Sequence, residues 1–238
     1  MDDKIRKLKE IIDGSDNIVF FGGAGVSTES GIPDFRSVDG LYNQKYKYPP
    51  ETILSHSFFE ANPEEYYRFH HDKLRLTGAK PNAAHRKLAE WEAQGKLKAV
   101  ITQNIDGLHQ AAGSKNVIEL HGSLLRCYCS RCRKPYPYQA VNDCAGVPRC
   151  TCGGVIRPDI VFYEEALDED DISRAVHYIR EADVLIIGGT SLVVYPAAGL
   201  VNYYRGHKLI LVNRGTTSQD NSADLVIREK IGEVFSQL

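Results

Sequence analysis

The sequence predicts an α/β protein with a Rossmann-like parallel sheet and helices on both faces, a small inserted zinc-ribbon module and a helical or loop insert. Three observations lead to this prediction. Short apolar runs alternate with helical segments along most of the chain. A glycine-rich turn follows the first of these runs, and all six cysteines fall between Cys127 and Cys152. The length of 238 residues suits one large domain that carries smaller inserts.

The first helix is predicted over residues 3–13, where Ile5, Leu8 and Ile12 lie on one helical face. The predicted strands are runs of about four to six mostly apolar residues, which is typical of strands covered on both faces. These runs are 17–21, 97–102, 116–120, 159–162, 184–187 and 209–213. Helices are predicted over 57–77, from Ala83, around 168–181 and after 187, whereas 30–55 is expected to be a long loop. A loop of that length inside a compact domain is usually functional.

The ends of the predicted strands are expected to meet at one site. In an open parallel sheet, ligands bind beyond the carboxyl ends of the strands. The residues that follow the strands should therefore converge on one crevice. They are Gly22 to Thr28, Gln103 to Asp106, His121, Thr190 to Ser191, and Asn213.

The run from Gly23 to Thr28 has the character of a dinucleotide-binding turn. Glycine lets the backbone turn tightly and approach a pyrophosphate without a Cβ clash. The usual third glycine is absent, and no acidic residue ends the next strand, so a purely structural turn is an equally weighted alternative. In the loop that follows, Phe35 is expected to shield a reactive centre from water and Arg36 to pair with phosphate.

Polar residues follow the second and third predicted strands. Gln103, Asn104 and Asp106 offer amide and carboxylate groups that suit ribose hydroxyls and a carboxamide. Asn104 or Asp106 could instead cap the next helix, but capping needs one such residue, not three. His121 is placed to act as a general base near neutral pH. The sheet order that puts His121 beside Gln103 and Asp106 favours this role over a structural one.

The cysteines have the spacing of a metal site. Cys129 and Cys132 form a CxxC pair, and a CxC pair, Cys150 and Cys152, follows after seventeen intervening residues. Clustering in a chain without a recognisable leader favours metal over disulfides. We predict a closed four-thiolate structural zinc site, which leaves no open position for chemistry. Cys127 could form an alternative CxC pair with Cys129, and Cys144 is left over.

Composition excludes some functions. The chain has 29 basic and 31 acidic residues and a formal net charge of −2, which argues against a general nucleic-acid binder. The N-terminus lacks the apolar core of a signal peptide. The uncharged stretch 184–204 contains glycines and a proline, as a strand, a turn and a buried helix would. We expect a cytoplasmic protein with no membrane and no direct nucleic-acid partner.

Together these residues resemble the sirtuins, the NAD-dependent protein deacylases, in the form of a bacterial-type catalytic core. The matching motifs occur in family order and span nearly the whole chain. They are Gly23 to Arg36, Thr102 to His109, Glu119 to Gly122, the two cysteine pairs, Arg157 to Phe162, Gly189 to Pro196, and Val212 to Asn213.

The resemblance implies a protein-lysine deacetylase that acts on acetyl-lysine proteins or peptides and yields nicotinamide, free lysine and O-acetyl-ADP-ribose. His121 and Asn104 would be catalytic, with His121 deprotonating a ribose hydroxyl. The expected NAD contacts are Ala24, Thr28, Phe35, Arg36, Gln103, Ile105, Asp106, His121, Thr190, Ser191, Asn213 and Ile231. The substrate would pair as an added strand with Val161, Phe162 and Tyr163 on one side and with the segment near Val193 and Val194 on the other.

Three departures from the family pattern carry expectations of their own. The usual Phe-Gly-Glu reads Tyr163-Glu164-Glu165, so peptide selectivity is expected to differ. The CxC pair is one residue shorter than the common one, which tightens the zinc knuckle. Desuccinylating relatives carry Tyr-x-x-Arg, whereas the corresponding stretch here runs from Tyr67 to His70 without that arginine. We therefore expect neutral acyl groups, acetyl above all.

The expected NAD-binding domain comprises residues 1–36, 80–125 and 156–238, with 37–79 as the helical or loop insert and 126–155 as the zinc-binding module. Two other functions remain open. One is an ADP-ribosyltransferase or NAD glycohydrolase on the same fold, and the other is a non-catalytic NAD or ADP-ribose sensor. The presence of Asn104, Asp106 and His121 together favours the deacetylase.

Overall fold

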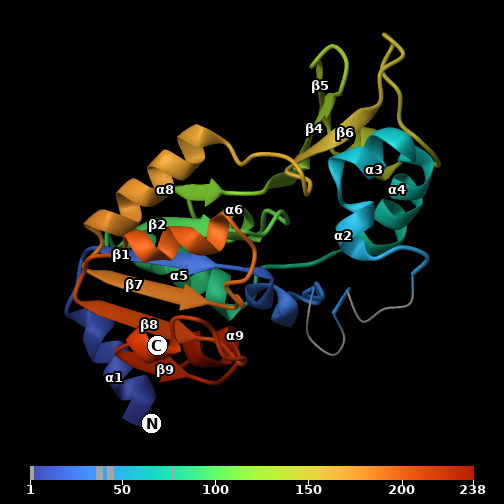
Figure 1. The fold of residues 1–238 in the computed structure, drawn as a ribbon. Coiled ribbons are helices and arrows are strands. Elements are labelled where there is room, and N and C mark those ends of the chain that lie inside the picture. Colours follow the sequence, from blue (N-terminus) through green and yellow to red (C-terminus); the bar gives the residue numbers. More distant parts are fainter. Residues whose placement is uncertain (1–2, 36–39, 42–45, 77) are drawn as a thin grey trace.

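A computed structural model describes residues 3–35, 40–41, 46–76 and 78–238 (Figure 1). Its main sheet has the strand order β3-β2-β1-β7-β8-β9, and every neighbouring pair is parallel. The strands are β1 (Ile18–Gly22), β2 (Leu97–Thr102), β3 (Val117–Glu119), β7 (Val184–Gly188), β8 (Lys208–Val212) and β9 (Leu225–Ile227). The predicted parallel sheet is confirmed, and β9 is a strand that sequence reasoning missed.

The two middle strands, β1 and β7, have no polar side chain and are buried throughout, because both faces of the sheet are covered. In β1, Ile18 and Phe20 pack into one core cluster, and Val19 and Phe21 pack into the other. The first cluster takes in α1 (Asp3–Asp13), α5 (Ala83–Ala93) and α9 (Ile231–Phe235). The second takes in α8 (Glu169–Glu181) and the 3₁₀ helix η5 (Ala197–Tyr203). Helices therefore cover both faces, as predicted (Figure 1).

β1 and β7 lie side by side at the point where the strand order reverses. From β1 the chain builds β2 and β3 on one side, and from β7 it builds β8 and β9 on the other. Chain connections on the two sides leave a crevice at the carboxyl ends of such a strand pair, and ligands bind there. A ligand of this sheet is therefore expected to bind beside the loops that follow β1 and β7.

A second, antiparallel sheet corrects one prediction. It has the order β5-β4-β6 and consists of β4 (Gly122–Cys129), β5 (Pro135–Pro137) and β6 (Ile156–Ile160). Residues 159–162 were predicted to be a strand of the parallel sheet, but 159 and 160 end β6 and 161–162 lie outside any strand. A short apolar run does not specify its sheet partner, because any covered face satisfies it.

The segment predicted as one helix over 57–77 is broken into several. It contains α3 (His56–Ala61), α4 (Pro63–Phe69) and a π-helical turn, η4 (His70–Leu74), after α2 (Pro50–Ile53). Pro63 is the first residue of α4, where its missing N–H and fixed φ are tolerated, so the proline separates α3 from α4. The predicted loop over 30–55 likewise includes α2 near its end.

The helical insert and the cysteine-bearing sheet share one apolar cluster. Phe59 and Tyr66 of the insert belong to the same cluster as Cys127 and Phe162. The Tyr67 hydroxyl donates to the carbonyl of Ile156 in β6. We call this assembly of α2–α4, η4 and β4–β6 the small lobe. It lies beyond the carboxyl ends of the main strands (Figure 1).

The short elements that remain are η1 (Ala24–Val26), η2 (Thr28–Ser30), α6 (Leu108–Ala111), α7 (Gln139–Asn142) and η6 (Asp220–Ser222). No helix in the described part of the chain combines the length and apolar character needed to cross a bilayer. The uncharged stretch 184–204 is divided into β7, a loop and η5, as its glycines and proline predicted.

Candidate active site

The loops that follow β1 and β7 are packed directly against each other. The Gly25 N–H donates to the carbonyl of Gly189 at 2.8 Å. A Cβ on Gly25 would lie 2.8 Å from the Cα of Gly189, and Gly189 itself has a φ of +58°. Glycine is therefore required at both positions by backbone approach. This contact explains the glycines by the close packing of the two loops.

Three polar side chains from two loops form a buried cluster. The Ser27 hydroxyl donates to Asp106 Oδ2 at 2.6 Å and accepts from Asn104 Nδ2 at 3.1 Å. All three residues are less than a tenth exposed. The structure thus brings Asn104 and Asp106 together, as the sequence predicted. Ser27 lies in the turn that was predicted to reach this crevice, but the sequence analysis gave it no role of its own. Its role follows from the rule that buried polar groups need hydrogen-bond partners.

Asp106 has both a structural and a site-facing role. Its Oδ1 accepts from the Leu108 N–H at 2.8 Å, so the carboxylate also satisfies the first N–H of α6, although the N-cap residue of that helix is Gly107. Burial raises the pKa of the Asp106 carboxyl, and the hydrogen bonds from Ser27 and Leu108 oppose that rise. Asn104 bonds instead to Ser27 and, through its N–H, to the Thr102 hydroxyl.

Gln103 joins three strand ends. Its Nε2 donates to the Thr190 hydroxyl after β7 at 3.1 Å and lies 3.3 Å from the carbonyl of Gly22 at the end of β1. Its own carbonyl oxygen is 3.0 Å from His121 Nδ1, which follows β3. The expected convergence of these loops at one edge is confirmed for Gln103, His121 and Thr190.

His121 has the geometry of a base. Because a carbonyl can only accept, its contact with Gln103 places the proton on Nδ1 and the lone pair on Nε2. Burial lowers the pKa of His121 below its usual value, against a smaller opposing effect of the Gln103 carbonyl. The ring is therefore neutral at pH 7 and can accept a proton at Nε2.

The other predicted cofactor contacts have diverse surroundings. Ser191 is exposed, and Asn213, half-buried after β8, donates its N–H to Ile227 and its Nδ2 to the Gly215 carbonyl. The half-buried Phe35 packs against the small-lobe cluster.

Ile231 is buried in the main core, so its side chain does not line an open surface. Arg36 lies outside the described residues.

A further carboxylate connects the glycine turn to α9. Glu29 Oε2 accepts from the Gly232 N–H at 2.6 Å, close to the start of that helix. A negative group stabilises the first turn of a helix, where backbone N–H groups lack partners. Glu29 therefore holds Ile231 and its neighbours beside the turn, a role that its place in the sequence did not reveal.

The predicted substrate residues lie on two segments. The Val161 N–H donates to the His121 carbonyl at 3.0 Å, and no hydrogen bond to the Val161 carbonyl is found in the described part of the chain. Phe162 is buried in the small lobe. On the other segment Val193 is 53% exposed, and the Val194 carbonyl accepts from Ala198 at 2.8 Å. Val161 and Val193 thus retain surface for a partner.

Four cysteines form one thiol cluster. The sulfurs of Cys129, Cys132, Cys150 and Cys152 all lie within 4.8 Å of one another. The distances are 3.5 Å between Cys129 and Cys152 and 3.7 Å between Cys132 and Cys150. Tetrahedral Zn–S bonds of about 2.3 Å imply sulfur separations of about 3.8 Å, so the set fits zinc. Cys127 is buried outside this cluster, so the thiol set contains the CxxC pair Cys129 and Cys132 and not the alternative CxC pair of Cys127 and Cys129.

Comparisons with known proteins agree over nearly the whole chain. The model of the Sir2 family matches residues 23–196. An NAD-dependent protein deacetylase of Clostridium perfringens is 60% identical and covers 100% of this chain and 99% of its own length. One of Cutibacterium acnes is 50% identical over 97% of this chain and 95% of its own.

Solved structures give the same picture. A Sir2 complex with deacetylated p53 peptide and 3′-O-acetyl-ADP-ribose has a TM-score of 0.91 and 41% identity. A Sir2 complex with p53 peptide and NAD⁺ has a TM-score of 0.87 and 42% identity. Each covers 98% of this chain and 96% of the other chain.

Proposed function

The chain belongs to the Sir2 family, and on that premise we propose which of its residues carry out the reaction. The protein is an NAD-dependent protein-lysine deacetylase whose products are nicotinamide, deacetylated lysine and O-acetyl-ADP-ribose. Its substrates are acetylated proteins or peptides. We propose that the protein is cytoplasmic.

The crevice at the carboxyl ends of β1 and β7 is the proposed NAD site. The packed glycine loops allow close backbone approach there, and the half-buried Gln103 keeps the two loops in register. The residues proposed to line the site are Ala24, Thr28, Phe35, Arg36, Gln103, Thr190, Ser191 and Asn213. For Ile231, whose side chain is in the core, any contact with NAD has to come from the main chain.

The nicotinamide end is assigned to the Ser27–Asn104–Asp106 cluster. A carboxamide offers both a donor and an acceptor, which Asp106 and the neighbouring main chain at Ile105 can satisfy. The cluster is preorganised, because Ser27 holds both Asn104 and Asp106 before any ligand binds. Asn104 is proposed to be catalytic through this arrangement.

The observation that carries the proposal is the hydrogen bond from His121 Nδ1 to the Gln103 carbonyl. It fixes the tautomer, so Nε2 accepts a proton from a ribose hydroxyl of NAD. The hydroxyl oxygen is then the nucleophile that receives the acyl group from lysine. NAD supplies the leaving group and the acceptor, whereas this chain orients both and takes the proton. Deacetylation of a peptide in the absence of NAD would contradict the proposal.

The pH dependence of kcat/KM should report the lowered pKa of His121. The base must be neutral, and burial lowers its pKa, so activity is retained below the pH at which an ordinary histidine would be protonated. We expect the acid limb of the profile to have its midpoint below about 6.5. Rates measured from pH 5 to 8, with stability controlled at each pH, check this; an acid limb centred above 7 would contradict it.

Acetyl-lysine should be preferred over succinyl-lysine. The Tyr67 hydroxyl is bonded to Ile156, and Arg68 is exposed and paired with Glu65 at 2.6 Å. His70 is fully buried, and burial lowers its pKa to about 4, so it stays neutral. No group of this stretch is free to pair with an acyl carboxylate. We expect kcat/KM for a succinyl peptide to be at least about tenfold lower than for the matched acetyl peptide, and equal values would refute this expectation.

For the thiol cluster, we propose zinc as a structural ion held by Cys129, Cys132, Cys150 and Cys152. The sulfur separations support a tetrahedral four-thiolate site. With four protein ligands the ion takes no part in the reaction. Its proposed role is to hold the ends of β4 and β6 together, and with them the small lobe.

A further inference from the structure

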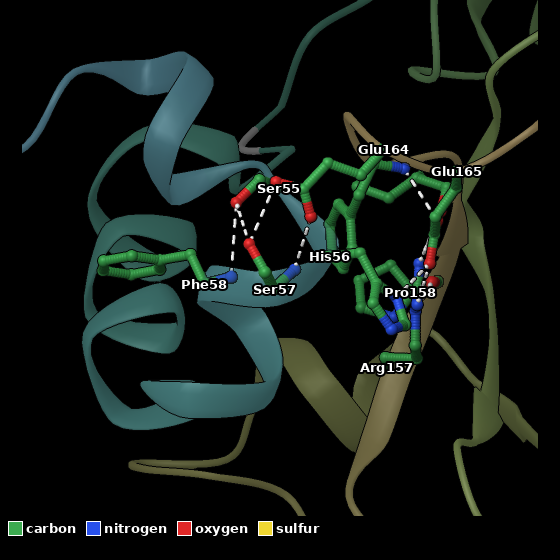
Figure 2. A network of polar contacts seen from close by, with 10 residues as sticks. Ser55, His56, Ser57, Phe58, Arg157, Pro158, Glu164 and Glu165 are labelled. Atoms are coloured by element: carbon green, nitrogen blue, oxygen red, sulfur yellow. Dashed lines mark hydrogen bonds and ion pairs between the residues drawn. The ribbon is translucent and has the colours of Figure 1, made fainter.

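Two adjacent glutamates hold the end of β6 against the helical insert (Figure 2). Glu165 accepts two hydrogen bonds from the buried Arg157, at 2.7 and 2.9 Å, and one from the Phe162 N–H at 2.8 Å. Its Oε1 also lies 2.8 Å from His56 Nδ1. Glu165 therefore secures the turn after Phe162 to the interior of the small lobe.

Glu164 points the other way, toward α3. Its Oε2 accepts from the Ser57 N–H at 2.9 Å, and its Oε1 accepts from the Ser57 hydroxyl at 2.9 Å. Ser57 is the second residue of α3, where backbone N–H groups have no partner within the helix. The carboxylate thus satisfies an N–H group of the first turn and places a negative charge where the helix favours one.

The backbone at Glu164 is in a conformation that favours glycine. Its φ is +76°, in the left-handed region where a Cβ is strained. The family pattern has glycine at this position, and this chain places a glutamate there instead. The backbone strain at Glu164 is therefore accompanied by two charge-assisted hydrogen bonds from its side chain to Ser57. We infer that these hydrogen bonds offset the strain.

The backbone beside Glu164 is joined to the same helix. The Tyr163 N–H donates to the Leu54 carbonyl at 2.9 Å, and the Tyr163 carbonyl accepts from the His56 N–H at 3.0 Å. These bonds use the main-chain groups of Tyr163, so this residue cannot pair a substrate strand through them. What the contacts do is fix the position of Val161 and Phe162 relative to the insert.

We propose that Glu164 is a positioning residue for peptide binding. Its two hydrogen bonds with Ser57 attach the segment after β6 to the first turn of α3. They thereby hold the main chain at Val161, to which a substrate strand would pair, in the required position. This inference rests on the proposed function, since it needs that stretch of main chain to bind the acetylated peptide. Glu164 is not among the residues proposed to contact NAD or the reacting atoms, so its substitution should change the KM for peptide and leave kcat and the KM for NAD unchanged.

The test is the steady-state kinetics of Glu164→Ala, Glu164→Gln and Ser57→Ala with two acetyl peptides, one flanked by basic and one by neutral residues. We expect Glu164→Ala to raise the peptide KM about five- to tenfold, with smaller rises for the other two, because each keeps one of the two hydrogen bonds. The rise should be the same for both peptides. In the double variant Glu164→Ala/Ser57→Ala, the KM should equal that of Glu164→Ala alone.

Each other outcome has a definite meaning. An unchanged peptide KM in Glu164→Ala at an unchanged melting temperature overturns the inference. A rise confined to the basic peptide also overturns it, because the carboxylate would then contact the substrate directly. Should Glu164→Ala fail to fold, an unchanged KM in both Ser57→Ala and Glu164→Gln overturns it instead. Failure of the proposed function is distinguishable, because the unmodified protein would then show no NAD-dependent turnover.

Discussion

His121→Ala should reduce kcat for deacetylation by about 10²- to 10⁴-fold, the contribution expected of a positioned general base. Gln103 and the Ser27–Asn104–Asp106 cluster should keep their positions in this variant, because their other hydrogen bonds do not involve the imidazole. NAD binding, measured by calorimetry, should therefore survive within a few-fold. The combination of retained binding and lost turnover is what separates a base from a structural histidine.

A matched control is His177→Ala, which removes an exposed imidazole on α8. This variant should keep full activity. Turnover of His121→Ala within a few-fold of the unmodified protein would show that another group takes the proton. Loss of NAD binding together with activity would instead indicate that His121 supports the crevice and does not act as its base.

Cys129→Ala should release zinc and unfold the small lobe. Structural zinc in small domains contributes about 10–16 kcal/mol of apparent binding free energy, as much as the whole stability of a typical domain. Cys129 ends β4, and its sulfur lies 3.5 Å from that of Cys152 and accepts from the Cys132 N–H. The loss should be visible as a metal content near zero, protease cleavage within residues 122–160, and abolished peptide turnover.

Cys144→Ala is the control for this prediction, because Cys144 is half-buried and stands outside the thiol cluster. It should bind one zinc ion per chain and keep its activity. Cys129→Ala with normal metal content would remove Cys129 from the ligand set. Unaltered melting of the metal-free protein would contradict a structural role for the ion.

The positions of the site residues that directly follow a strand could be predicted from the sequence. Parallel strands end at one edge, so Gln103, His121 and Thr190 had to meet once their runs were recognised as parallel strands. The clustering of Cys129, Cys132, Cys150 and Cys152 was likewise predicted from the spacing of two cysteine pairs. In both cases a residue's place depends on local sequence and on a general rule of topology.

Sequence reasoning failed where a residue's role depends on a distant partner that neither the strand order nor a spacing motif brings to it. Ser27 bonds Asp106, which is 79 residues away, and Glu29 bonds Gly232 at a separation of 203. Glu164 meets Ser57 across 107 residues. Such contacts leave no periodic pattern. The run 159–162 was assigned to the wrong sheet for the same reason. An apolar run indicates that its residues are buried, but it does not indicate which strand or helix they pack against.

The role of NAD as acyl acceptor is tested by incubating the protein with an acetyl-lysine peptide and NAD and quantifying every product by mass spectrometry. If a ribose hydroxyl of NAD, deprotonated by His121, receives the acyl group, then nicotinamide, deacetylated peptide and O-acetyl-ADP-ribose must form in equal amounts. Free ADP-ribose beside an unchanged peptide, or ADP-ribose attached to protein, would contradict the account. Those products would assign the crevice to NAD hydrolysis or ADP-ribosyl transfer.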